Sequence, residues 1–282
     1  MIISTRHSIG IIGGEGRTGG QFARLFKKHG FTVRATGSKT KRQNESILRN
    51  CDIVIFALPL KSAATMITGF SKKARRKDQL LLDLSSLKVN EVKAMLCGAG
   101  EVIGMHPLFG PSTDPKGETI ILCPARVRKE TMTSLTNVLH RLGLKTVVMT
   151  PGEHDRFMAI VQVIPHLKSL LMAEVMRSMK IDFSKVLSMC TPTYEMEFNI
   201  VGRFLDDHPG LYMPIIFRNP ETKRILRLME KSVKNLTTLA SKDNLNAAEK
   251  RYSACRRFFE PHLNKARSHS EACIRTLLSL SR

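Results

Sequence analysis

Residues 8–20 read SIGIIGGEGRTGG, and this stretch decides the fold of the first half of the chain. A short apolar run enters a turn with the spacing GxGxxG, and an amphipathic run that ends at His29 leaves it. The order predicts a strand, a tight turn and a helix whose N-terminus holds the pyrophosphate of a dinucleotide, although a glycine-rich loop without a ligand would share the spacing. We expect Gly14 to form the turn, Gly16 to admit the pyrophosphate and Gly19 to let the helix pack on the strand. The predicted cofactor-binding residues of the loop are Gly14, Gly16, Arg17, Thr18 and Gly19.

The residues after the second predicted strand, 31–36, bear on the choice of cofactor. An NAD-binding unit usually carries Asp or Glu here, on the ribose 2′-hydroxyl, but no acid occurs between Glu15 and Glu45. Ser38, Lys39 and Arg42 offer a hydroxyl and cations that suit a 2′-phosphate. The loop therefore favours NADP, with NAD as the alternative and an ordinary basic loop as the unremarkable interpretation. Glu15 would be unfavourable beside a pyrophosphate, so we expect its side chain to point outward.

Further apolar runs at 52–59, 79–84, 101–105, 119–123 and 145–149 alternate with helical patterns at 61–70, 90–96 and 129–142. This alternation predicts an α/β domain with a largely parallel, Rossmann-like sheet. Ligands of such sheets meet the loops at the carboxyl ends of strands. The predicted functional residues at those ends are Leu58 and Pro59 for the cofactor and Ser86, Lys88 and His106 for catalysis.

Pro151-Gly152 marks a predicted domain boundary, with a dinucleotide-binding domain in residues 1–150 and an all-helical domain in residues 151–282. The first helix beyond the boundary carries a stripe of small and polar side chains on an otherwise apolar surface. The stripe consists of Asp155, Ala159, Gln162, His166, Ser169 and Ala173. Such a stripe predicts a polar cleft or a partner, while His166 alone is equally typical of a core or interface histidine.

The composition sets the class of protein. The chain has 282 residues, 42% of them hydrophobic, and a formal net charge of +21, which predicts a soluble globular protein. The bases are scattered, with one compact run at 71–77 that we interpret as a solvated loop, so we expect no nucleic-acid contact. Six cysteines without CxxC spacing predict reduced thiols and no metal site. The apolar window 157–176 contains Gln162, His166, Lys168 and Glu174, so we expect no membrane segment. The reduced cysteines predict a cytoplasmic location.

Several motifs together resemble the prephenate dehydrogenase family. They are the glycine loop, Ser86 with Lys88, the run 106–111 (HPLFGP), Glu153-His154-Asp155, His166 and the run 201–203 (VGR). The resemblance spans nearly the whole chain. It implies a nucleotide-binding domain followed by a helical domain that forms a homodimer, and NAD(P)-dependent oxidative decarboxylation of prephenate, a dianionic cyclohexadienyl substrate, to 4-hydroxyphenylpyruvate in tyrosine biosynthesis.

The same resemblance implies the parts played by individual residues. His106 would be the catalytic base toward the ring hydroxyl, with Ser86 and Lys88 beside it, while His166 and Arg203 would bind the substrate. Arginine suits a substrate carboxylate because its planar fork pairs with two oxygens. The alternatives are a dehydrogenase of arogenate or 4-amino-4-deoxyprephenate, and a non-catalytic NADP-binding or nucleic-acid-binding protein on the same scaffold.

Overall fold

The computed structural model describes residues 1–280, which form two compact units. The first unit comprises Met1–Gln162 and Gly210–Pro220, and the second comprises Val163–Pro209 and Glu221–Arg282. The chain therefore leaves the first unit, builds part of the second, and returns for one short helix before completing the second.

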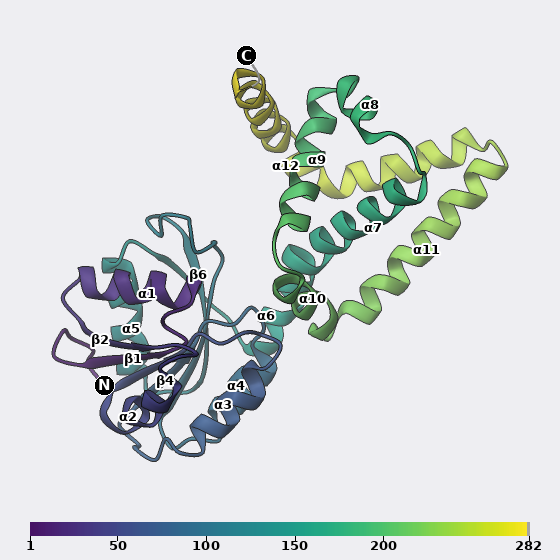
Figure 1. Ribbon diagram of the computed structural model, residues 1–282. Helices are drawn as coiled ribbons and strands as arrows, with labels where there is room; N and C mark the ends of the chain where they lie inside the picture. Colours follow the sequence, from purple (N-terminus) through teal and green to yellow (C-terminus); the bar gives the residue numbers. More distant parts are fainter. Residues whose placement is uncertain (281–282) are drawn as a thin grey trace. The chain divides into compact units, whose positions relative to one another are not determined.

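A seven-stranded sheet forms the centre of the first unit, in the order β2-β1-β3-β4-β5-β6-β7 (Figure 1). Neighbouring strands are parallel except β5 and β6, which pair antiparallel. The Rossmann-like fold expected from the sequence is confirmed. The strands are β1 (Ser8–Ile12), β2 (Thr32–Thr36), β3 (Ile53–Phe56), β4 (Leu80–Asp83), β5 (Glu101–Pro107), β6 (Thr119–Arg126) and β7 (Lys145–Val148).

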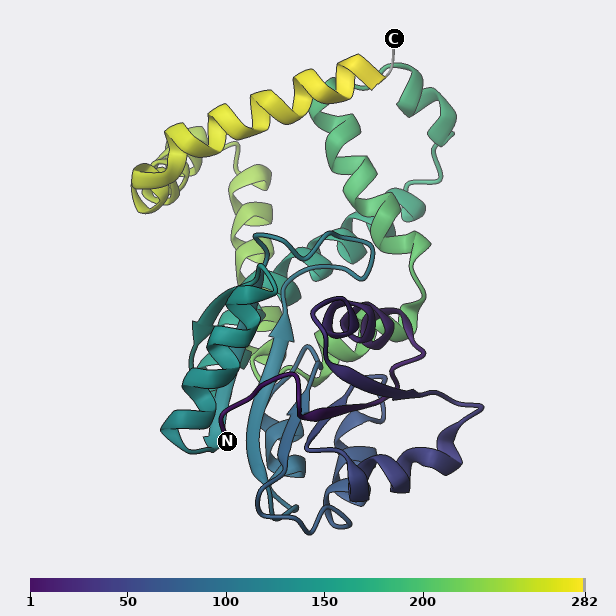
Figure 2. The same cartoon turned by 90° about the vertical axis from the view of Figure 1, so that its left-hand side faces the viewer.

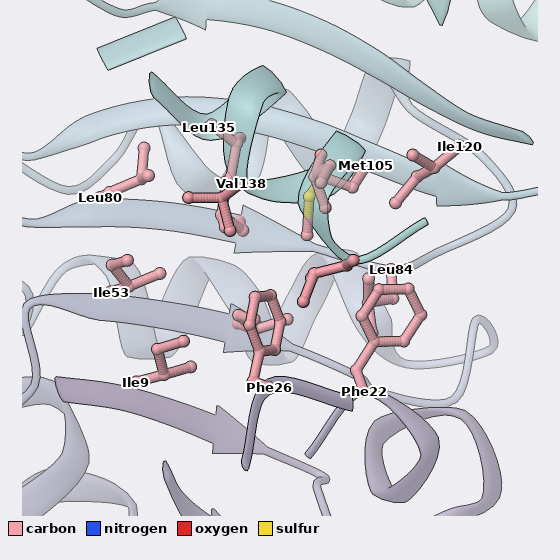
Figure 3. Close-up of a cluster of buried hydrophobic side chains, with 14 of the residues drawn as sticks. Ile9, Phe22, Phe26, Ile53, Leu80, Leu84, Met105, Ile120, Leu135 and Val138 are labelled. Atoms are coloured by element: carbon pink, nitrogen blue, oxygen red, sulfur yellow. The ribbon is translucent and has the colours of Figure 1, made fainter. Parts of the chain in front are cut away.

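Helices cover both faces of this sheet, so its central strands are apolar on both sides. On one face, side chains of the sheet pack with Phe22 and Phe26 of α1 and with Leu135 and Val138 of α5 (Figure 3). Burying an aromatic or aliphatic side chain of this size contributes about 1.5–3 kcal/mol. The helices of the first unit are α1 (Arg17–Lys28), η1 (Lys41–Gln43), α2 (Asn44–Asn50), α3 (Ala63–Ser71), α4 (Val89–Met95), α5 (Lys129–Arg141), α6 (Pro151–Met158), the π-helical turn η2 (Ala159–Val163) and α10 (Pro209–Arg218). Val163 at the end of η2 and Pro209 at the start of α10 already belong to the second unit.

The glycine turn after β1 differs in one detail from the expectation. Gly13, rather than Gly14, has the left-handed backbone, with φ at 87°. A Cβ there would also lie 2.1 Å from the carbonyl oxygen of Ala57, so no other residue fits. Gly14 is needed for packing instead, because a Cβ on it would lie 2.8 Å from that of Ala35. Gly19 allows α1 to approach the turn as expected, since its Cβ would lie 2.4 Å from the Gly13 carbonyl oxygen.

The second unit is built from helices. They are α7 (Ile164–Ser178), α8 (Phe183–Ser188), α9 (Pro192–Asp206), α11 (Thr222–Ser241) and α12 (Leu245–Leu280). Helix α12 contains Pro261, and its C-terminal part runs as a long helix, drawn in yellow in Figure 2. No strand occurs in this unit within the described residues, as the sequence predicted.

Helices α6, η2 and α7 follow one another as a 28-residue helix, Pro151–Ser178, which by length and composition alone is apolar enough to cross a membrane. Its first part belongs to the first unit, where His154 and Asp155 are buried. Along the run, Ala159 and Ser169 of the small and polar stripe are buried, whereas large apolar side chains such as Ile160 and Val175 are more than half exposed. Part of the apolar surface of the helix is therefore exposed in the single chain, while Met158, Val163 and Leu167 are buried.

Candidate active site

His106 is the next-to-last residue of β5 and lies within the first unit, only 3% exposed. Two residues earlier on the same face of the strand, Gly104 leaves room for a buried lysine, since a Cβ there would lie 2.8 Å from Cδ of Lys88. The antiparallel neighbour β6 places Ile121 opposite His106. The histidine expected at the end of a strand is therefore held in the sheet itself.

A chain of hydrogen bonds runs from His106 into helix α6. Nδ1 of His106 lies 2.9 Å from Nε2 of His154, and Nδ1 of His154 lies 2.7 Å from Oδ1 of Asp155. The two imidazole rings meet edge to face, with centroids 5.0 Å apart. All three side chains are almost fully buried, so water does not compete for these contacts.

This chain assigns the protons on both rings. The Asp155 carboxylate accepts hydrogen bonds on both oxygens from backbone N–H groups, of Lys88 at 2.9 Å and of Val89 at 3.1 Å. It accepts the third from Nδ1–H of His154, which leaves Nε2 of His154 as an acceptor. His106 must then donate from Nδ1, and its Nε2 carries a lone pair. Burial, together with the neighbouring His154 ring and the Lys88 ammonium, holds the pKa of His106 well below its usual value, so the ring is neutral.

Lys88 is fully buried and bridges the parts of this site. Its ammonium donates to Oδ2 of Asp83 at 2.5 Å and to the backbone carbonyl oxygen of Met105 at 2.8 Å, directly before His106. Its backbone N–H holds Asp155. The side chain of Lys88, expected to act in catalysis, therefore links β4 to β5, and its backbone links both to α6. Ser86, two residues earlier, is half-buried at the end of β4.

Several buried polar atoms in and around this network lack a hydrogen-bond partner among residues 1–280, among them Oδ1 of Asp83 and Oγ of Ser85, and two more matter for the site. One is Oε2 of Glu91, and the other is Oε1 of Gln162, whose amide nitrogen lies 3.4 Å from Nε2 of His106. Burial, and secondarily the negative charge of Asp83, raises the pKa of Glu91 to about 7. The contact of Gln162 with Nε2 of His106 is long and weak, so a better hydrogen-bond donor can replace it.

The glycine loop has the features of a pyrophosphate site. No side chain caps the N-terminus of α1 at Gly16, where the helix dipole favours an anion. A pocket of about 340 Å³ opens at this point, lined by Glu15, Gly16, Arg17, Arg24, Pro111 and Ser112. Thr18 is half-buried in the first turn of α1. The residues present fit a dinucleotide with its phosphates on this helix.

The remaining predicted cofactor residues surround this loop in the first unit. Leu58 is half-buried and Pro59 exposed, directly after β3. Ser38, Lys39 and Arg42 are exposed in the segment after β2. Glu15 is exposed but does not simply point outward as expected, because its Oε1 accepts a hydrogen bond from the Thr40 hydroxyl at 2.7 Å.

The two predicted substrate-binding residues, His166 and Arg203, lie in the second unit. His166 on α7 stacks on Phe204 of α9, with ring centroids 5.7 Å apart, and burial lowers its pKa. Arg203 precedes Phe204 on α9 and is exposed. The structure thus brings His166 next to the helix turn that carries Arg203, while His106, Ser86 and Lys88 belong to the first unit.

Comparison with known proteins places this arrangement in a family. The family model described as the prephenate dehydrogenase nucleotide-binding domain matches residues 27–149, and the one described as the prephenate dehydrogenase dimerization domain matches residues 150–251. The chain belongs to the prephenate dehydrogenase family. Most of α12 lies beyond the matched residues.

Relatives within the prephenate dehydrogenase family match nearly the whole chain at low identity. A probable arogenate/prephenate dehydrogenase of Methanocaldococcus jannaschii is 28% identical over 98% of this chain and 66% of its own length. The T-protein of Haemophilus influenzae is 28% identical over 82% of this chain and 61% of its own length. The chain therefore spans somewhat under two thirds of the length of these relatives.

Solved structures share the fold. Prephenate dehydrogenase from Aquifex aeolicus, in complex with hydroxyphenyl propionate and NAD+, superimposes with a TM-score of 0.68 at 19% identity, covering 92% of this chain and 98% of that one. Arogenate dehydrogenase from Synechocystis gives the same TM-score at 16% identity, over 93% and 99% of the two chains.

The structure adds residues that the sequence reasoning left out of the site. His154 and Asp155 belong to the Glu-His-Asp motif that pointed to the prephenate dehydrogenase family, yet the contact of His154 with His106 comes only from the packing of α6 on the sheet. One feature of the sequence could have indicated Asp83 as a site residue, because it is a carboxylate at the end of an otherwise apolar strand. Nothing in the sequence singled out Glu91, whose burial depends on the position of α4.

Proposed function

We propose that this chain is an NAD(P)-dependent dehydrogenase that oxidatively decarboxylates prephenate or a close cyclohexadienyl analogue. The observation that carries the proposal is the chain His106–His154–Asp155, which presents a neutral imidazole with a free Nε2 in a member of the prephenate dehydrogenase family. The glycine loop on the same unit supplies a fitting dinucleotide site. Arogenate and 4-amino-4-deoxyprephenate are the alternative substrates.

His106 takes the part of general base in this reaction. The substrate hydroxyl replaces the weak Gln162 contact and donates its hydrogen bond to Nε2 of His106. A nicotinamide dinucleotide held at the glycine loop would supply the acceptor for the hydride of the ring carbon that bears this hydroxyl. The hydroxyl proton passes to Nε2 as the C–O bond becomes a carbonyl. Loss of carbon dioxide then returns two electrons to the ring, which becomes aromatic, and Nε2 gives the proton back to the resulting phenolate oxygen.

His154, Asp155 and Lys88 fix the tautomer and the position of His106 for this step. His154 and Asp155 hold Nδ1 protonated, so that the free lone pair is always on Nε2. Positive charge that develops on His106 is shared along the chain toward the Asp155 carboxylate. Lys88 acts as a positioning residue, because it anchors both the Met105 carbonyl before His106 and the Asp155 carboxylate.

The substrate has two acidic groups, or one in addition to an amino acid, and these need cationic or hydrogen-bonding partners. We propose Arg203 for a carboxylate, His166 for a second polar contact and Ser86 for a hydrogen bond near the reacting ring. Arg203 is exposed, and the planar guanidinium of an arginine can pair with both oxygens of a carboxylate. The cofactor proposed from the cations after β2 is NADP, with NAD also accepted.

We further propose a homodimer through the helical domain. The family model that covers residues 150–251 is described as a dimerization domain. In the single chain Ile160, Val161 and Val175 are each more than half exposed, and a second copy would cover such an apolar surface. Analytical ultracentrifugation measures the resulting mass directly.

The test is a turnover assay at 340 nm with NAD and NADP against prephenate, arogenate and 4-amino-4-deoxyprephenate. His106→Asn should keep cofactor binding and lower kcat by about 10²–10⁴-fold, because asparagine donates and accepts hydrogen bonds but takes up no proton at neutral pH. His262→Asn, on the exposed surface of α12, is the matched control. Absence of turnover with all three substrates and both cofactors would refute the activity, and a fully active His106→Asn variant would refute the base.

A further inference from the structure

The side chain of Glu15 takes a position that the sequence did not predict. Glu15 lies in the glycine loop, and its backbone N–H donates to the carbonyl oxygen of Thr36, the last residue of β2, at 3.3 Å. Its carboxylate then extends over Gly37, where a Cβ would lie only 2.2 Å from Oε2 of Glu15. The absence of a side chain at Gly37 therefore makes room for a carboxylate at the end of β2.

Thr40 fixes the orientation of this carboxylate. The Thr40 hydroxyl oxygen accepts the backbone N–H of Gly37 at 2.7 Å and donates its own hydrogen to Oε1 of Glu15 at 2.7 Å. Among residues 1–280, Oε2 of Glu15 makes no hydrogen bond within the protein. An acceptor oxygen is thus held at the carboxyl end of β2, next to the pocket at the N-terminus of α1.

The end of β2 is where a Rossmann-like fold meets the ribose of the adenosine half. The group that usually receives the ribose 2′-hydroxyl there is an acid carried by the strand end itself. Here β2 ends in Thr36 and is followed by Gly37, and neither carries a charge. Glu15 brings a carboxylate to the same place from a different position in the chain.

We propose that Glu15 is the residue that sets the choice between the two nicotinamide dinucleotides, by accepting the ribose 2′-hydroxyl of NAD and repelling the 2′-phosphate of NADP. Ser38, Lys39 and Arg42, exposed in the next residues, act in the opposite direction. The chain therefore accepts both dinucleotides, and Glu15 is what keeps NAD competitive. This inference rests on the dinucleotide site of the proposed function and not on the identity of the substrate.

Binding measurements without substrate test the proposal. The dissociation constants of NADH and NADPH are measured from nicotinamide fluorescence at fixed ionic strength for the full chain, Glu15→Gln and Glu130→Gln, the last being an exposed glutamate of α5. Glu15→Gln should tighten NADPH and weaken NADH, so that the ratio of the two constants shifts toward NADPH on the order of tenfold or more. Glu130→Gln should leave the ratio unchanged.

A second variant separates the role of the carboxylate from a structural effect on the loop. Adding Ser38→Asp to Glu15→Gln places an acid in the segment after β2 and should restore discrimination against NADPH. A ratio that changes less than about twofold in Glu15→Gln would overturn the assignment while leaving the dinucleotide site intact. If the unaltered protein binds neither NADH nor NADPH, the dinucleotide site fails and the assignment of Glu15 fails with it. If both bind but no cyclohexadienyl substrate is turned over, only the proposed activity fails.

Discussion

Replacing Glu91 by glutamine should stabilise the protein, and the gain should depend on pH in a direction that the structure dictates. Glu91 is 3% exposed on α4, and Oε2 of its carboxylate has no hydrogen-bond partner among the described residues. Asp83 and Asp155 add negative charge nearby, which outweighs the contribution of Lys88. Glutamine has the same shape as protonated glutamate and carries no charge at any pH.

The size of the effect follows from the pKa of Glu91, which is raised from 4.5 to about 7. Between these values the folded chain binds a proton that the unfolded chain has lost, so the free energy of unfolding falls as the pH rises through this window. Each pH unit in the window corresponds to about 1.4 kcal/mol. The stability gained by Glu91→Gln should therefore grow by about 2–3 kcal/mol between pH 5 and pH 8.

Urea unfolding at pH 5, 6, 7 and 8, followed by far-UV circular dichroism, measures this difference through the midpoint of the transition. Glu130→Gln, at an exposed position of α5, controls for the loss of one negative charge. The titration of Glu91 can also be followed through its carboxyl carbon by NMR. A gain that is equal at pH 5 and pH 8, or a carboxyl that titrates near 4.5, would refute the argument from burial.

Two further outcomes follow from the site. Because the pKa of His106 lies well below 6.5, kcat/KM should stay constant on acidification through pH 6.5 and fall only at lower pH, which a pH–rate profile checks; a midpoint at 6.5 or above would contradict the buried, neutral histidine. Arg203→Ala should raise KM for the substrate and leave the dissociation constant of NADH unchanged, since truncating one partner of a desolvated charge pair costs about 2–5 kcal/mol; an unchanged KM would remove Arg203 from the substrate site.

The central strands β3, β4 and β5 could be predicted from the sequence because they are buried on both faces and therefore appear as continuous apolar runs. The edge strands β2 and β7 are largely exposed but also lie where strands were predicted. The helices α3, α4 and α5 begin and end within two residues of the predicted bounds. The reversed direction of β6 and β7 could not be predicted, because a short apolar run carries no signal of strand direction. Helix α2 was not predicted either, since it has only seven residues and a largely exposed surface.

The candidate site could be predicted only in part. His106 stood out because it follows an apolar run and precedes two prolines, and the structure places it at the end of β5. The surroundings of Lys88 could not be read from the sequence, because a lysine is usually solvated and its partners, Asp83 and the Met105 carbonyl, are brought to it by the packing of β4 and β5. Glu15 shows the same limit, since the direction of its side chain depends on Thr40, which is distant along the chain.

His106 and Glu91 affect the pH dependence of stability in opposite directions. His106 stays neutral in the folded chain while the unfolded chain becomes protonated near pH 6.5, so this histidine lowers stability as the pH falls below that value. Glu91 stays protonated in the folded chain up to about pH 7, so it lowers stability as the pH rises from 4.5. Between pH 4.5 and 6.5 the two contributions to the free energy of unfolding change in opposite directions as the pH rises. Outside this range they do not add to each other. Above pH 6.5 only the Glu91 contribution still changes, because His106 is then neutral in both the folded and the unfolded chain. The cost in stability at higher pH therefore comes from the buried carboxyl of Glu91. The ion pair between Asp83 and Lys88 stabilises the surrounding backbone and offsets part of that cost. The hydrogen bonds from the backbone N–H groups of Lys88 and Val89 to Asp155 act in the same direction.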